Sequence, residues 1–395
     1  MVSLYIPGFL INLGFSIVSP ILPLYAQSFG VPYALAAMVI SANAFARVFA
    51  DIPLGTICDR VGRRLLIIFG PLLVAVSAIL CGIAQSFPEL LVYRVITGVG
   101  MAMWMVARQA TIADSIPSAI RGRVMSTFQG ISMAGSAAGP AVGGIVAELW
   151  GYRAPFFFYA ACAFASLIAC VLLVKESAPL NKEKSKPAFA ADFRLILGSL
   201  SFPIVMAVFA NFSNSFRIAA RNVLIPLYGN DVLNLTSGEI GLILTVSTVS
   251  MILMTLPGGW LVDKYGRKTG LVPAFIFTGI VFCLFPLSSD FTGAIFVASI
   301  LGLATGLGGG ASMTLAADLS PEGHKGLFLG FWQTIGDLGM TVGPFTLGFV
   351  ADVYGLVMPF YVVAALMLFT AGTTQFFVKE TLNKAEKSLK KALKR

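Results

Sequence analysis

The sequence predicts an all-α membrane protein whose twelve transmembrane helices form two six-helix halves related by pseudo-two-fold symmetry. Composition is the first observation behind this prediction: 57% of the residues are hydrophobic and 11% are charged, whereas about a quarter of the residues of a soluble domain are charged. Apolar runs of about twenty residues, the length that a helix needs to cross a bilayer, recur along the whole chain. The second observation is that the second half of the chain repeats the first.

The apolar runs are expected to be helices rather than barrel strands. Backbone groups inside lipid must be hydrogen-bonded within the spanning structure, and barrel strands would alternate in polarity over about ten residues. These runs are longer and apolar on all sides, and the first has no basic segment before it, so it is expected to be a span and not a signal peptide. The predicted spans cover roughly 5–26, 33–57, 65–86, 89–113, 122–147, 154–175, 200–228, 238–262, 269–288, 291–316, 326–351 and 356–379.

The distribution of Lys and Arg predicts the orientation of these helices. Alternate connections are basic, and the connections on the other side hold only Arg153. Because Lys and Arg favour the cytoplasmic side, both termini and the connection 176–199 are expected in the cytoplasm, with the chain in the inner or plasma membrane. The net charge of +9 is then mostly topological, and its spread over many short loops argues against nucleic-acid binding.

The five cysteines are scattered through apolar segments and lack metal-ligand spacing. No metal site, disulfide framework or cofactor is therefore expected.

The internal repeat divides the chain into domains. We predict an N-terminal half at 1–175, a cytoplasmic linker at 176–199, a C-terminal half at 200–379 and a basic tail at 380–395. Near the start the two copies are offset by 203 residues, as between the PLY of 23–25 and the PLY of 226–228. Further along, the offset is 204 residues, as in Asp59/Asp263, Gly62/Gly266, Arg63/Arg267, Asp114/Asp318, Pro140/Pro344 and Glu176/Glu380.

Four motifs carry a family resemblance. GTICDRVGRR at 55–64 and GWLVDKYGRK at 259–268 resemble the loop 2–3 motif of the major facilitator superfamily and its echo in loop 8–9. YRVITGVG at 93–100 resembles the fourth-helix motif of the same family, and GSAAGPAVGG at 135–144 resembles its fifth-helix motif, which is associated with antiporters. Within the family the motifs are most similar to the drug:proton antiporter branch. The resemblance implies a midplane substrate site between the halves and transport by alternating access.

The loop motifs are expected to form a conformational latch at the cytoplasmic side. Gly55 and Gly62 allow close helix approach and a tight turn, and Arg63 can pair with Asp114. Asp59 can meet the positive N-terminus of a neighbouring helix, which the family resemblance identifies as helix 11. Arg60 and Arg64 fit equally well as residues that only set the topology. The predicted latch comprises Gly55, Asp59, Arg60, Gly62, Arg63, Asp114, Asp263 and Arg267.

The fifth span carries small residues at four-residue spacing: Gly135, Gly139 and Gly143. Small residues let helices approach closely, and Pro140 removes one backbone donor and bends the helix. We expect either plain packing or a bendable seam that prevents leak.

Charged residues inside spans are candidate functional groups, because each costs about 2.5–3.5 kcal/mol at the centre of an inserted helix. Asp51 and Asp337 are the candidate proton carriers, and Asp337 is the most isolated acid inside a span. The resemblance ties Arg94 to proton coupling. Six residues belong to this set: Arg47, Asp51, Arg94, Arg217, Arg221 and Asp337.

The candidate substrate contacts are mostly cationic. Asn214, Arg217 and Arg221 share one face of the seventh span, and Arg47 and Asn12 complete the predicted set. Four arginines against two acids favour an anionic ligand, unless Asp51, Asp337 and helix C-termini neutralise them. Many exporters of cationic drugs carry an acid in the first span, and this chain has none there. Arg108 lies about 21 Å along its helix from Arg94, so it is expected to reach the cytoplasmic surface.

The predicted function is secondary active transport: proton-coupled antiport that exports a small amphipathic or acidic molecule, as in multidrug efflux. The alternatives are an organic-anion or phosphorylated-metabolite exchanger or symporter, and a non-transporting membrane sensor. An enzyme is not expected, because the sequence holds no nucleophile–base set, metal cluster or phosphate-binding loop. The protein is expected to be a monomer that binds a small-molecule substrate, protons and lipid.

Overall fold

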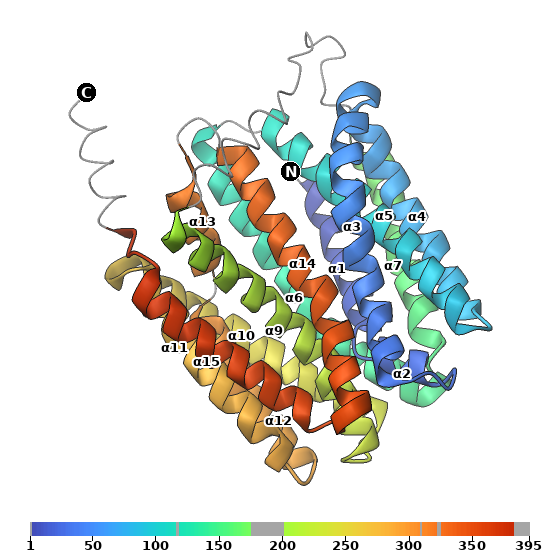
Figure 1. Cartoon of the computed structure of the whole chain (residues 1–395). Helices are drawn as coiled ribbons and strands as arrows, with labels where there is room; N and C mark the ends of the chain where they lie inside the picture. The colour runs from blue at the N-terminus through green and yellow to red at the C-terminus, as the bar shows by residue number, and fades with distance from the viewer. Residues whose placement is uncertain (1, 116–117, 175–200, 309, 322–324, 383–395) are drawn as a thin grey trace. The chain divides into compact units, whose positions relative to one another are not determined.

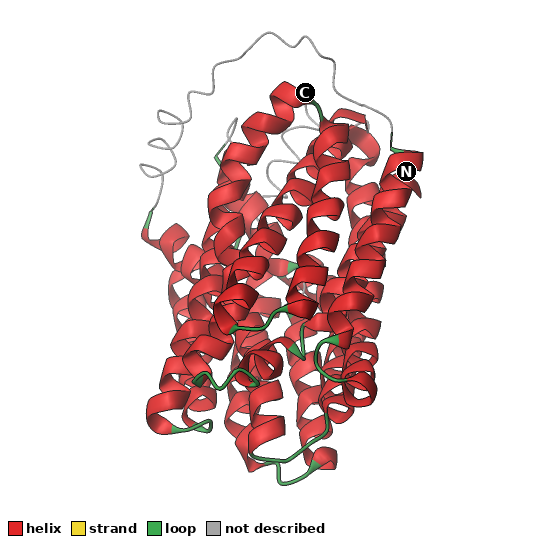
Figure 2. Cartoon of the chain, turned by 90° about the vertical axis from the view of Figure 1, so that its right-hand side faces the viewer, coloured by secondary structure: helices red, strands yellow, loops and turns green. Residues whose placement is uncertain are grey.

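A computed structural model describes the chain except for residues 1, 116–117, 175–200, 309, 322–324 and 383–395 (Figure 1). The side chains of 2–3, 52, 59, 113–115, 118–123, 125–126 and 325–327 are also outside the description. The predicted linker at 176–199 and most of the predicted tail therefore lie outside the described residues. All regular structure in the described part of the chain is helical (Figure 2).

Each predicted span corresponds to a helix or to two consecutive helices. The first is broken after Val18, where Pro20 cannot donate a backbone hydrogen bond, and the tenth is broken before Gly310, which has φ of 79°. The helices of the first half are α1 (Val2–Val18), α2 (Leu22–Gln27), α3 (Tyr33–Val61), α4 (Arg63–Ile83), α5 (Phe87–Ser115), α6 (Ser118–Trp150) and α7 (Ala154–Leu173). Those of the second half are α9 (Phe202–Asp231), α10 (Ser237–Tyr265), α11 (Arg267–Leu284), the 3-10 turn η1 (Phe285–Leu287), α12 (Phe291–Leu307), α13 (Ala311–Leu319), α14 (Lys325–Tyr354) and α15 (Met358–Phe377).

Nine of the described helical segments are long and apolar enough to cross a membrane. Large apolar side chains remain exposed on them, for example Leu256 at 82% and Phe376 at 81%. In a bilayer such side chains face lipid, which is as apolar as they are. Their exposure is therefore not costly, whereas in a soluble protein it would place apolar surface in water.

The helices form two compact units. The first contains residues 1–183 together with 221–245 and 341–356, and the second contains 184–220, 246–340 and 357–395. In the first unit α1 packs on α6 and α7, while α5 packs on α3 and α4. In the second unit α11 packs on α12, α13 and α15.

Two glycines make the one-residue turns between α3 and α4 and between α10 and α11. Gly62 has φ of 102° and Gly266 has φ of 114°, a region that residues with a Cβ atom avoid. The tight turn predicted at Gly62 therefore follows from backbone geometry. At Gly55, no described atom lies within 4 Å of the position of a Cβ atom, so the close helix approach predicted there is not seen in the first unit.

Candidate functional site

The basic loop motifs build the same contacts in each of the two units, at the end of that unit's helices that we call the basic end. Arg63 Nη1 donates to the Cys58 carbonyl at 2.9 Å, and Arg267 Nη1 donates to the Val262 carbonyl at 3.4 Å. Each arginine thus binds a carbonyl near the end of the helix before it, where the helix dipole is negative.

The residue that follows each of these arginines also donates to a backbone carbonyl, and the two acceptor residues occupy equivalent positions of the repeat. Arg64 Nη2 donates to the Val171 carbonyl of α7 at 3.5 Å, and Lys268 Nζ donates to the Gln375 carbonyl of α15 at 2.5 Å. From the sequence, Arg64 fits equally well as a charge that only sets the topology. In the structure it joins the start of α4 to the last turn of α7.

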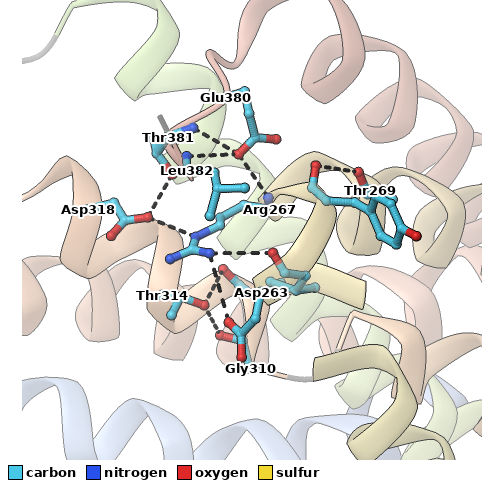
Figure 3. A network of polar contacts seen from close by, with 12 residues as sticks. Asp263, Arg267, Thr269, Gly310, Thr314, Asp318, Glu380, Thr381 and Leu382 are labelled. Atoms are coloured by element: carbon cyan, nitrogen blue, oxygen red, sulfur yellow. Dashed lines mark hydrogen bonds and ion pairs between the residues drawn. The ribbon is translucent and has the colours of Figure 1, made fainter. Parts of the chain in front are cut away.

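Arg267 is the centre of a charge network in the second unit (Figure 3). Its Nε lies 2.9 Å from Asp318 Oδ2, and its Nη1 lies 3.9 Å from Asp263 Oδ1. Thr381 Oγ1 donates to the same Asp318 oxygen at 2.7 Å. The Asp318 side chain is 17% exposed and that of Asp263 is 77% exposed, so Asp318 is the stronger partner of Arg267.

Glu380 completes this network and was not among the predicted site residues. Its carboxylate accepts the backbone N–H groups of Arg267 at 2.9 Å and Lys268 at 3.1 Å, so it caps α11 in place of Gly266, which has no side chain. Partial burial raises the pKa of Glu380, but four backbone donors outweigh this effect and lower the pKa below its ordinary value. The sequence signal was the Lys-Glu pair that recurs as 175–176 and 379–380.

Asp59 and Asp114 have side chains outside the described residues, so their latch roles remain predictions. Their repeat equivalents are Asp263 and Asp318, which both lie next to Arg267.

At the opposite end of the helices, two repeat-related acids in the first unit bind helix N-termini. Asp352 at the end of α14 accepts the backbone N–H groups of Tyr33 at 2.8 Å and Ala34 at 2.9 Å. Glu148 at the end of α6 accepts the backbone N–H of Gly238 at 3.1 Å. Each acid joins one sequence half to a helix start in the other half, where the dipole favours a negative charge.

The predicted seam of α6 packs against α1 within the first unit. A Cβ atom at Gly135 would lie 3.0 Å from the Phe9 carbonyl, and one at Gly143 would overlap the Ile17 carbonyl. Next to Pro140, the backbone N–H of Ala141 donates to Thr245 Oγ1 of α10 at 2.9 Å. The helix is therefore tightly packed on α1 and is also tied to α10.

On the polar face of α9, Arg217 and Asn214 contact each other. Arg217 is 6% exposed, and its guanidinium donates to Asn214 Oδ1 at 2.5 Å and to Thr278 Oγ1 at 3.4 Å. Asp337 on α14 is 5% exposed. Asp337 has a further interaction within the described residues, as Asp51 also does. The nearby glycines of α14 bring the two helices together, because a Cβ atom at Gly336 would lie 3.0 Å from Ser215 Oγ of α9.

The charges of the first unit are arranged differently. Arg47 and Asp51 are half-buried on α3 and both have partners. Arg94 on α5 is 2% exposed and lies 5.9 Å from the ring centroid of Phe15, and no acid of the described residues forms an ion pair with it. Arg221 on α9 has a buried Nε without a hydrogen-bond partner.

Asn12 uses its side-chain nitrogen within its own helix. Its Nδ2 donates to the Gly8 carbonyl at 2.7 Å. The amide oxygen and the second N–H of Asn12 therefore remain for the predicted contact with substrate.

Buried charges within spanning helices, and basic loop motifs that make the same backbone contacts in both halves of the sequence, are typical of a membrane transport protein. The Major Facilitator Superfamily model matches residues 4–236 and 207–395, and the chain belongs to this family. It is therefore a multi-pass membrane protein and a secondary transporter of a small molecule, and not an enzyme. The predicted all-helical fold and the family resemblance are confirmed.

Several curated relatives match over most of the chain. An uncharacterised MFS-type transporter of Methanocaldococcus jannaschii is 29% identical and covers 89% of this chain and 91% of its own. Quinolone resistance protein NorA of Staphylococcus aureus is 24% identical, with 92% and 93% covered. Multidrug resistance protein MdtG of Klebsiella pneumoniae is 28% identical, with 92% and 89% covered.

The fold also matches solved structures. The crystal structure of a D-xylose–proton symporter superposes with a TM-score of 0.78 at 17% identity and covers 96% of this chain and 97% of its own. At this identity the likeness shows the fold alone.

Proposed function

We propose that this transporter exports a small amphipathic or acidic molecule in exchange for protons. The observation that supports this proposal most strongly is the buried polar group of the second unit, in which Arg217 binds Asn214 on α9 and Asp337 is buried on α14. A buried arginine binds an anionic or polar substrate group through its planar fork. A carboxylate buried within a span is suited to carry a proton. Drug resistance in the names of two relatives supports the direction of export.

In this proposal Asp51, Arg94 and Asp337 couple transport to protons. Asn12, Arg47, Asn214, Arg217 and Arg221 contact the substrate. The loop motifs at the basic end hold one conformation until binding and protonation release it, as alternating access requires.

The test measures proton flux in liposomes that contain the purified protein and a pH-sensitive dye, under an imposed proton gradient. Lipophilic cations and organic anions are added in turn. We expect anions to trigger flux that Arg217→Ala abolishes and that Asp337→Asn uncouples from the gradient, while Asp337→Glu retains coupling. Coupled transport that is unchanged in Asp337→Asn would remove that residue from the mechanism.

A second candidate is an organic-anion or phosphorylated-metabolite exchanger or symporter. It is favoured by Arg94, which is buried without an ion-pair partner among the described acids. Anion-for-anion exchange without proton flux in the same liposomes would support this candidate over antiport.

A further inference from the structure

Arg108 on α5 does not reach the surface, contrary to the expectation from sequence. It is 9% exposed, and its Cζ lies 4.2 Å from the ring centroid of Phe128 on α6. Its Nε is buried without a hydrogen-bond partner, and no described acid pairs with it. Stacking on one aromatic ring offsets only part of the cost of burying an ion.

A second arginine belongs to the same part of the fold. Arg47 lies on α3, which packs directly on α5, the helix of Arg108. Arg47 has an interaction of its own, so Arg108 is the cation that an anion would neutralise, and Arg47 adds positive charge to the same six-helix half.

The internal repeat provides a comparison for this place in the fold. At the offsets already given, Gly8, Arg108 and Phe128 correspond to Asn211, Ser312 and Trp332. In the second half these residues form a neutral, satisfied cluster. Asn211 Nδ2 donates to the Trp332 carbonyl at 2.7 Å, and Ser312 Oγ donates to Asn211 Oδ1 at 3.1 Å.

In the first half the same three positions create space for a cation. A Cβ atom at Gly8 would overlap the Phe128 ring, so glycine allows that ring to occupy the place that Asn211 fills in the other copy. Arg108 then stacks on the ring. Packing alone does not require a charge here, since the repeat-related position is filled by a serine with a neutral partner.

We propose that Arg108, together with Arg47 and Phe128, forms a subsite for the carboxylate of an amphipathic organic acid. This inference deepens the proposed function and rests on it, since it assigns the substrate class. Phe128 covers one face of the guanidinium, so the edge of the fork is the part that can donate to both carboxylate oxygens. The acid neutralises a cation that the fold leaves without an acidic partner in the described residues.

The test is binding of radiolabelled salicylate to the purified full-length protein in lipid-free detergent, by scintillation proximity. We expect Arg108→Gln to weaken binding roughly tenfold or more, the loss of a charge-assisted hydrogen bond, and Arg108→Lys to restore part of it. Phe128→Leu should weaken binding less. Arg153→Gln, which removes one loop arginine, should leave binding unchanged. Tetraphenylphosphonium, a cation, should not compete.

Salicylate binding that is equal in wild type and Arg108→Gln would overturn the subsite. Binding of dihexanoyl phosphatidylglycerol without binding of salicylate would also overturn it, because the anion that Arg108 binds would then be a lipid phosphate and not a carboxylate. The proposed function fails separately: liposomes that show no solute-driven proton flux, with salicylate binding still lost in Arg108→Gln, would refute antiport and leave the subsite standing. Flux triggered by anions in both wild type and Arg108→Gln would leave antiport standing and refute the subsite.

Discussion

At the scale of single residues, burial decides which charges matter at the basic end. Arg267 has two acids within ion-pair distance, but Asp318 is closer and more buried than Asp263. An exposed ion pair contributes about 0–1 kcal/mol, whereas removal of a buried partner leaves a desolvated charge unsatisfied. The two acids beside Arg267 should therefore contribute differently to the stability of the protein.

Asp318→Asn is expected to destabilise the protein by about 1–3 kcal/mol, because Arg267 would keep a neutral acceptor and lose its buried counter-charge. Apparent melting temperature in detergent measures the effect. Asp263→Asn is the matched control and should change stability by less than about 0.5 kcal/mol. Equal effects of the two variants would show that exposure does not rank these acids.

At the scale of elements, helix ends and glycine contacts fix the arrangement of each unit. Glu380 caps α11 from beyond the end of α15, so these two helices, which pack on each other, are also joined at the basic end. On α6, Gly135, Gly139 and Gly143 touch α1, Gly144 touches α10, and Gly130 faces open space. The effect of a Gly→Ala substitution on stability should therefore depend on where the glycine lies along α6.

Glu380→Gln is expected to lower the stability of the protein at pH 7 by about 1 kcal/mol, as loss of a helix cap does. The pKa of Glu380 is lower in the folded protein than its ordinary value of 4.5. The stabilisation by its charge is therefore complete above pH 4.5 and is lost as the pH falls through the lowered pKa. The difference in melting temperature between wild type and variant should shrink over that acidic range. A difference that is independent of pH would exclude the charge as its cause.

Gly143→Ala should destabilise the protein by about 1–3 kcal/mol, because its methyl group would overlap the Ile17 carbonyl and backbone cannot yield as a side chain does. Gly130→Ala on the same helix is the control, since no described atom lies within 4 Å of its Cβ position. Melting temperature and transport rate in liposomes would both be compared. A Gly143→Ala protein as stable as Gly130→Ala would contradict the tight contact of α6 with α1.

At the scale of the whole molecule, the two sequence halves are joined inside the first unit. Asp352 binds the start of α3, Glu148 binds the start of α10, and the two acids occupy repeat-related positions. These contacts involve only helix ends. Their loss should therefore loosen the starts of α3 and α10 without unfolding the first unit.

The double variant Glu148→Gln/Asp352→Asn is expected to speed hydrogen–deuterium exchange of the amides at 33–36 and 237–240 by roughly tenfold, because neutral acceptors bind helix N-termini more weakly. Mass spectrometry of peptides from these segments measures the rate. Asp290→Asn is the matched control, since it only neutralises the cap of α12, where the Gly293 N–H donates to Asp290 at 2.8 Å, and it should affect only 291–294. Unchanged exchange at 33–36 would show that Asp352 does not stabilise the start of α3.

The sequence by itself determined the helical class, the twelve spans and the repeat, because apolar length and residue spacing are local properties that follow from the bilayer and from duplication. It also determined the glycine turns at Gly62 and Gly266, since positive φ is a local requirement. Only the tertiary structure decided three facts: Glu380 caps α11, Asp318 is a closer and more buried partner of Arg267 than Asp263, and Arg108 is buried against Phe128. Those facts depend on burial and on contacts between residues far apart in the chain, which neither composition nor periodicity encodes.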